Sequence, residues 1–357
     1  MNTPHSILIL AASLLLATST AAQVSPPPPA AQPPATKPAA QPKTKPHAIN
    51  KPAAATAQDK PGTPAAPTAA ANPTPVPDDP NVDLVYGAYQ RGMYKTAFDL
   101  ATTRAQAGDA KAMTMLGELY ANALGIKHDD AKAVGWYKRA SDLGDREAMF
   151  ALAMMRIAGR GGPVDKQEAV RLLASSAKLG EPKAAYNLAL LYLDGQTLPQ
   201  DVKRSAELLR MAADAGNPEA QYALATFYKE GTGVPKDMDK AVRLLQAASV
   251  ADNVDAEVEY AIALFNGTGT PKNPTAAVAL LKKAARQGSP IAQNRLARVL
   301  VDGMGGTPMD KVEGLKWHLI AKTAGKGDLY LDEAYAQLSP EDRAKVDNAA
   351  KRWLGTK

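Results

Sequence analysis

Small and apolar residues recur along most of the chain with a period of 36 residues. The most regular column is alanine, and four positions later comes a large apolar column that is followed directly by a small one. The alanine column consists of Ala112, Ala148, Ala184, Ala220, Ala256 and Ala292. The large column consists of Leu116, Leu152, Leu188, Leu224, Tyr260 and Leu296, and the small column consists of Gly117, Ala153, Ala189, Ala225, Ala261 and Ala297. Because the register holds through six copies, the pattern indicates an internal repeat.

Polar and glycine columns divide each copy into two helices. The first helix follows a residue that can accept a hydrogen bond from the first turn, namely Asp109, Asp145, Glu181, Asn217, Asn253 or Ser289. It ends before a glycine that can adopt the left-handed conformation, namely Gly159, Gly195, Gly231, Gly267 or Gly303. The second helix follows Asp129, Asp165, Asp201, Asp237, Asn273 or Asp310, and second helices end before Gly108, Gly144, Gly180, Gly216, Asp252 and Gly288. Asp165 and Glu168 also have the spacing of a capping box.

One helix pair cannot bury its apolar face alone, so consecutive pairs must stack. The sequence therefore predicts an all-α fold, a solenoid of antiparallel helix pairs. Residues 82–108 keep the second-helix pattern without a long loop and are expected to form a degenerate first repeat. Full repeats are expected near 109–144, 145–180, 181–216, 217–252, 253–288 and 289–325, within a helical repeat domain that covers 81–325. Capping helices are expected over 326–357, where Ser339 and Pro340 favour a helix start.

These columns resemble the Sel-one-like repeat (SLR) family, a relative of the tetratricopeptide repeats. That family has a short helix with A-x-Y-x-L-G-x-x-Y, a G-x-G-V loop, and a second helix with D-x-x-K-A-x-x-W-Y-x-K-A-A-x-x-G. Residues 184–216 read AAYNLALLYLDGQTLPQDVKRSAELLRMAADAG, and 112–144 carry LGELY and KAVGWYKRA. The resemblance covers 82–325, with departures at Asp252 and in GMGGTPMDK, which is one residue longer. It implies a right-handed α/α superhelix that binds partners. Similar exported bacterial proteins look like adaptors in envelope regulation, polysaccharide systems and host interaction.

The N-terminus carries the features of a cleavable export signal. Residues 6–17 form the apolar run SILILAASLLLA, which is shorter than the roughly 20 residues that a membrane span needs. Thr20, Ala21 and Ala22 fit the small-x-small pattern of a cleavage site. We therefore expect a signal peptide over 1–22, no stable membrane span after its cleavage, and an exported protein that is periplasmic or secreted. An uncleaved anchor is the alternative, because no Lys or Arg precedes the apolar run.

Residues 23–80 differ in composition from the rest of the chain, since they hold 17 of its 28 prolines. Proline removes backbone donors and prevents helix or sheet growth, and such a segment buries too little apolar surface to offset the entropy of ordering. The sequence therefore predicts a disordered Pro/Ala-rich linker over 23–80. It is either a tether that lets the repeat domain search for a partner or a plain spacer.

Charge and residue types exclude several classes of function. The net charge is +6, from 42 basic and 36 acidic residues without long runs of one sign, so no nucleic-acid partner is expected. The chain has no cysteine, which excludes disulfides, thiolate metal sites and cysteine nucleophiles. His128 lies in an expected loop and His318 in an expected helix, and no G-x-S-x-G motif is present. We expect no catalytic residues, no cofactor and no metal site, and hence no enzyme activity.

A partner is expected on the first helices, which line the concave face in stacked helix pairs. Phe150, Tyr186 and Tyr222 recur there at repeat spacing, and rigid aromatic side chains are good anchors for a ligand. The alternative is that these aromatic residues only pack between helices. Lys229 and Arg298 depart from the repeat pattern. The candidate ligand-binding residues are Phe150, Tyr186, Tyr222, Thr226, Lys229, Asn294 and Arg298.

Together these features predict a non-catalytic protein–protein interaction scaffold or regulator in the bacterial cell envelope, which binds its partner on the concave face. The alternative is a module that binds glycan, so that a polysaccharide or peptidoglycan takes the place of the protein partner. A hydrolase is the remote third class.

Overall fold

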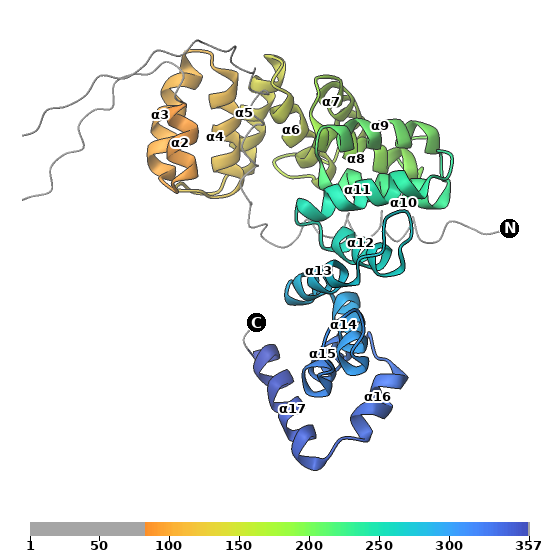
Figure 1. Cartoon of the computed structure of the whole chain (residues 1–357). Helices are drawn as coiled ribbons and strands as arrows, with labels where there is room; N and C mark the ends of the chain where they lie inside the picture. The colour runs from red at the N-terminus through yellow and green to blue at the C-terminus, as the bar shows by residue number, and fades with distance from the viewer. Residues whose placement is uncertain (1–82, 356–357) are drawn as a thin grey trace, which may run out of the picture.

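The computed structural model describes residues 83–355, in which helix pairs follow one another along a curved path from α2 to α17 (Figure 1). The predicted signal peptide and linker lie outside the described residues. The first helices of the full repeats are α4 (Ala110–Ala121), α6 (Arg146–Ala158), α8 (Pro182–Asp194), α10 (Pro218–Glu230), α12 (Val254–Asn266) and α14 (Pro290–Asp302). The second helices are α5 (Asp130–Asp142), α7 (Lys166–Lys178), α9 (Val202–Asp214), α11 (Met238–Val250), α13 (Pro274–Arg286) and α15 (Lys311–Thr323).

Four further helices close the two ends of the array. α2 (Leu84–Gln90) and α3 (Tyr94–Gln106) precede the full repeats, and α16 (Leu329–Ala336) and α17 (Pro340–Gly355) follow them. The described part of the chain contains helices, turns and loops and no strand. The all-α solenoid of helix pairs that the sequence predicts is therefore confirmed.

Side-chain caps start the helices at the positions that the polar columns indicate. Asn217 Oδ1, for example, accepts a hydrogen bond from Ala220 N at 2.7 Å, which satisfies one backbone group that a helix end leaves without an internal partner. The same role is confirmed for all predicted first-helix caps, Asp109, Asp145, Glu181, Asn217, Asn253 and Ser289. Local sequence thus fixes where the first helix of each repeat begins.

Only one of the two hydrogen bonds of the predicted capping box at Asp165 forms. Asp165 Oδ1 accepts from Glu168 N at 2.8 Å, but Glu168 Oε2 accepts from Arg156 Nε at 2.6 Å. Asp165 N donates to the Arg156 carbonyl at 3.0 Å and has no need of the Glu168 side chain. The Glu168 carboxylate binds Arg156 instead, because the guanidinium on the preceding helix is a charged donor.

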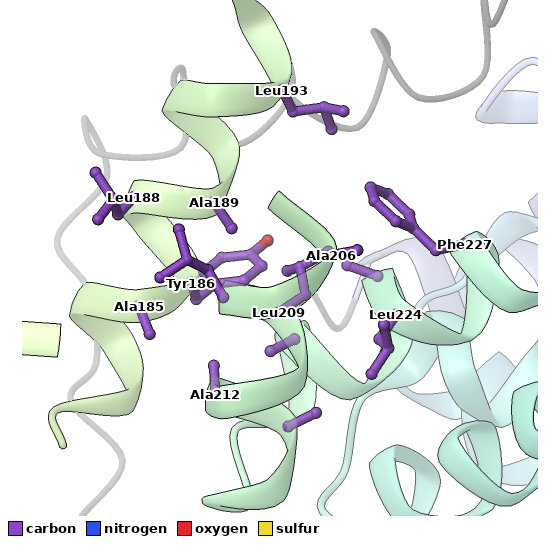
Figure 2. Packing of buried hydrophobic residues seen from close by; sticks show 14 of the residues in the cluster. Ala185, Tyr186, Leu188, Ala189, Leu193, Ala206, Leu209, Ala212, Leu224 and Phe227 are labelled. Carbon is purple, nitrogen blue, oxygen red and sulfur yellow. The ribbon is translucent and has the colours of Figure 1, made fainter. Parts of the chain in front are cut away.

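Small residues at fixed positions let the helices approach closely. Ala148, Ala184 and Ala220 are fully buried, and Leu188 in the large apolar column is 4% exposed. Figure 2 shows how Leu188 and Ala189 of α8 lie in one apolar cluster with Leu209 of α9. The core is therefore an apolar seam of successive buried clusters that share partly buried residues such as Leu172 and Tyr260. It is built from the contacts of each helix with the one before and the one after it.

The closing residue of the fourth repeat keeps the backbone geometry of the glycine that it replaces. Asp252 has a φ of 61°, whereas the corresponding Gly216 and Gly288 have φ values of 85° and 97°. Its carboxylate accepts a hydrogen bond from Lys283 Nζ at 2.5 Å, and the same ammonium group lies 2.6 Å from the fully buried Glu257. The left-handed turn is thus retained, and α13 is tied to the start of α12.

The C-terminal helices cover the last full repeat. Leu331 of α16 and Val346 of α17 are fully buried, and the rings of Trp317 and Trp353 meet edge to face with centroids 4.9 Å apart. The side chain of Asp332 also lies 2.8 Å from Nε2 of the buried His318. This end of the array is therefore closed partly by apolar contacts and partly by acidic groups of α16.

Candidate functional site on the first helices

The three aromatic residues predicted at repeat spacing lie on successive first helices. Phe150 of α6 and Tyr222 of α10 are partly buried against the apolar seam, and Tyr186 of α8 is only 5% exposed. Figure 2 shows the Tyr186 ring among the side chains that join α8 to α9. A packing role is thus seen directly for Tyr186, whereas Phe150 and Tyr222 keep part of their surface exposed.

These aromatic positions face the beginning of the next first helix. At the equivalent position in the first full repeat, Thr114 Oγ1 donates to Asp145 Oδ1 at 3.0 Å. Burial raises the pKa of Tyr186, and the carboxylate of Glu219 at the start of α10 adds to the effect. At Thr114 and Tyr186 this position therefore lies beside an acidic group of the next repeat.

The acidic surroundings are strongest at Tyr222. Burial raises its pKa to about 12, and the Glu259 and Asp255 carboxylates of α12 contribute to that rise. Partial desolvation and the nearby Glu259 also raise the pKa of Asp255. Negative charge thus gathers on the first helices of the fourth and fifth repeats.

Thr226 and Lys229 lie on the same helix as Tyr222, and both have intramolecular partners. Thr226 Oγ1 donates to the carbonyl of Tyr222 at 3.2 Å, one helical turn earlier. Lys229 Nζ forms an ion pair with Glu259 at 2.9 Å, which links α10 to α12. The structure therefore brings Tyr222, Thr226 and Lys229 together as one group, with a salt bridge at its edge.

Asn294 and Arg298 form a second group on α14, away from the first one along the array. Both meet Asp328 at the start of α16: Arg298 Nε donates to its carboxylate at 2.6 Å, and Asn294 Nδ2 lies 3.3 Å from it. The Arg298 guanidinium also lies over the Tyr330 ring, 5.6 Å from its centroid. These two side chains hold the C-terminal helices in place, and a ligand-binding role for them stays a prediction.

Sequence reasoning missed two exposed acidic residues on this surface. Glu219 and Asp255 occupy the same position in consecutive repeats, and both are exposed. Within residues 83–355 neither forms an ion pair. The sequence shows only that both residues lie in the first turn of a helix, where an acidic side chain is favourable. That position is the same for an acid that stabilises the helix and for one that binds a partner.

In the described residues no group of three or more His, Cys, Asp or Glu side chains is placed to hold a metal ion. His128 is exposed beside Asp130, at 3.4 Å, and His318 is buried against Asp332. None of the helices between residues 83 and 355 is both long and apolar enough to cross a membrane.

Stacked helix pairs of this length and order define an α-solenoid repeat protein. The Sel1 repeat model matches residues 110–145, 146–181, 182–217, 218–250, 254–289 and 290–326. The chain belongs to the Sel1 repeat family, as the resemblance to SLR proteins predicts. Sel1 repeats mediate protein–protein interaction, and their fold is generally a non-catalytic scaffold.

Solved structures of related repeat proteins share this fold. The Sel1 repeat protein from Oxalobacter formigenes is 26% identical, with a TM-score of 0.61, over 68% of this chain and 100% of that protein. A protective antigen present in uropathogenic Escherichia coli strains, which displays an SLR fold, is 23% identical with a TM-score of 0.51. That match covers 73% of this chain and 64% of the antigen. No curated protein sequence matches the chain.

Proposed function

We propose that this protein is a non-catalytic scaffold of the cell envelope, and that it binds a partner protein on the first helices α8, α10 and α12. The observation that carries the proposal is the pair of exposed carboxylates, Glu219 and Asp255, which form no ion pair within residues 83–355. They stand beside the hydroxyl ends of Tyr186 and Tyr222. In a solenoid the concave face formed by one layer of helices is the usual binding surface.

The charge on this surface selects the chemistry of the partner. Lys229 neutralises Glu259, but Glu219 and Asp255 remain uncompensated. A partner segment that presents Lys or Arg side chains at a spacing of one repeat would meet both carboxylates. Such charge complementarity favours encounter and fixes register, and Tyr222, which is only partly buried, adds apolar contact area.

Site-specific photo-crosslinking in intact cells tests this assignment. A photoreactive residue is placed at Lys183 or Asn187 on the first helix α8, or at Lys178 or Lys203 on second helices, all at surface positions. We expect the two first-helix positions to crosslink to the same envelope protein and the two second-helix positions not to do so. Crosslinks to that protein from the second helices alone would contradict the proposed surface.

Export is the part of the proposal that rests on the N-terminal sequence. The apolar run 6–17 and the Thr20-Ala21-Ala22 pattern support cleavage after Ala22. N-terminal sequencing of protein from the periplasmic fraction should begin at Gln23. A chain that retains Met1 and fractionates with the cytoplasm would show that these residues are not an export signal.

A further inference from the structure

A second candidate binding site lies between the second helices α13 and α15 and the first helix α14, away from the surface of α8, α10 and α12 proposed above. A hollow of about 400 Å³ is bordered by α13 and α15 and by the loop 303–310. Leu296, Leu300 and Trp317 form its nearly buried floor, and the exposed Pro308 and Met309 of the loop form its apolar rim. Lys282 and Arg286 stand on the α13 side. Hollows of roughly 300–1,000 Å³ are of the size that holds small ligands.

The two cations of the hollow are available to an incoming anion. Within residues 83–355 neither Lys282 nor Arg286 forms an ion pair or a side-chain hydrogen bond. They are four residues apart on one helix, so both side chains emerge on the same face. A single carboxylate between them would receive charged donors from two directions, and a guanidinium can bind a carboxylate through two parallel hydrogen bonds.

The acidic residues of the hollow already have donors at one oxygen each. Asp310 Oδ1 accepts from Glu313 N at 2.9 Å, as the cap of α15. Glu313 Oε1 accepts from Trp317 Nε1 at 2.9 Å and from Lys316 Nζ. Their second oxygens can still accept N–H groups, and their negative charge disfavours a polyanion in the same space.

Comparison of the repeats shows that this junction is unlike the others. At the positions of Lys282 and Arg286 the earlier second helices carry Lys138 and Asp142, Ala174 and Lys178, Arg210 and Asp214, and Gln246 and Val250. At the position of Trp317 the helix that follows each of those pairs carries Leu172, Leu208, Leu244 or Leu280. The loop 303–310 is also one residue longer than the loop 267–273 of the preceding repeat. Paired cations, a facing tryptophan and a longer loop therefore coincide at the hollow alone among these junctions.

We propose that this hollow binds the C-terminus of a peptide chain whose last residue is apolar. The terminal carboxylate lies between Lys282 and Arg286, and the last side chain packs against Pro308 and Met309 above the floor of the hollow. The peptide N–H groups donate to the second oxygens of Asp310 and Glu313. A peptide C-terminus combines one carboxylate, an apolar side chain and N–H donors in this order, whereas a fatty acid lacks the donors. The site is independent of the first-helix surface.

The test uses the full chain and short acetylated peptides that end in Leu, Ile, Val, Phe or Met, each as the free acid and as the amide. Calorimetry gives the affinity, and the effect of substitutions at Lys282 and Arg286 reports the location. We expect at least one free acid to bind and its amide to bind about tenfold more weakly or worse, because the charged hydrogen bonds are lost. Lys282→Ala/Arg286→Ala should weaken binding of the free-acid peptide to a similar extent.

Matched controls separate the site from general charge effects. Lys178→Ala/Lys203→Ala removes the same charge from exposed second-helix positions and should leave the affinity unchanged, and Lys282→Arg should retain binding. The proposal is overturned if none of the free acids binds at millimolar concentration, if acid and amide bind equally, or if the Lys282/Arg286 variant binds like the wild type. Tighter binding of octanoate than of every peptide would assign the hollow to a lipid acid and would also overturn it.

Discussion

Side-chain size is matched between the two helices of the first full repeat. Gly117 of α4 stands where the other repeats have alanine, and Tyr137 of α5 stands where four of them have leucine. A Cβ atom at Gly117 would lie 2.6 Å from the Tyr137 ring. Glycine thus makes room for the larger partner, and the small column is set by contact across the pair as well as by helix propensity.

This contact predicts that Gly117→Ala destabilises the protein, although alanine is normally the better helix former. Overpacking of this kind typically costs about 1–3 kcal/mol in the free energy of unfolding. Urea denaturation followed by circular dichroism measures the change. Adding Tyr137→Leu should remove most of the cost, since it restores the pairing found in other repeats.

Gly135 provides the control for that variant. It lies in helix α5, where an added Cβ would meet nothing within 4 Å. Gly135→Ala should therefore stabilise the protein by roughly 0.5–1 kcal/mol. If Gly117→Ala stabilised the protein as Gly135→Ala does, the close contact with Tyr137 would be refuted.

At the scale of single elements, two carboxylates tie α16 to the array beside the apolar contact of Leu331. Asp328 binds Arg298, and Asp332 lies between Lys322 Nζ at 2.6 Å and the buried His318 at 2.8 Å. The hydrogen bond from Lys322, and then the contact with His318, keep the pKa of Asp332 below its ordinary value. The ionised form of this carboxylate therefore favours docking of α16 on α15.

A lowered pKa sets the direction of the pH dependence. The stabilisation by Asp332 is complete above the ordinary pKa of an aspartate, about 4, and is lost as the pH falls through the lower pKa of the docked state. Amide hydrogen exchange, corrected for its chemical rate, should show that protection of α16 falls in acid more than that of α10. Asp332→Asn should lower the amide protection of α16 at neutral pH and reduce the further loss of protection in acid. An identical acid profile in wild type and variant would exclude this role.

Stacking between repeats should depend on the large apolar column. Leu188 is 4% exposed in the middle of the array, in the cluster that joins α8 to its neighbours. Leu188→Ala should cost about 2–5 kcal/mol in the free energy of unfolding. Lys203→Ala at an exposed position of α9 should change stability by less than about 0.5 kcal/mol. Equal losses in a denaturant titration would contradict the register of the repeat.

For the whole molecule, the helix bounds and their order were predictable from the sequence because caps and glycine turns are local. Asn217 at the start of α10 and Gly231 at its end specify that helix without reference to the rest of the fold. Contacts across helices were not predictable in this way. Asp328 lies beyond the last repeat column, so no periodic signal indicated that it would engage Asn294 and Arg298.

The candidate site was predictable only in part for the same reason. The repeat spacing placed Tyr186 and Tyr222 on one layer of helices, as the structure has them. How deeply Tyr186 is buried, and which carboxylates are left without a partner, depends on the packing of three consecutive repeats. Glu219 and Asp255 stand out only in the structure, because Lys229 pairs with Glu259 and leaves these two carboxylates without a cation.

The central claim is that the first-helix surface, and not the second helices, binds the partner. The most direct measurement is quantitative capture of the photo-crosslinked envelope protein by purified full-length variants. Glu219→Lys/Asp255→Lys reverses the two unpaired charges of the surface. Asp214→Lys/Asp239→Lys reverses two exposed acidic residues on the second helices α9 and α11 and serves as the charge-matched control. The account predicts that the first variant loses the partner by about tenfold or more while the control retains it, with unchanged helicity in both. Full recovery of the partner by Glu219→Lys/Asp255→Lys would contradict the account.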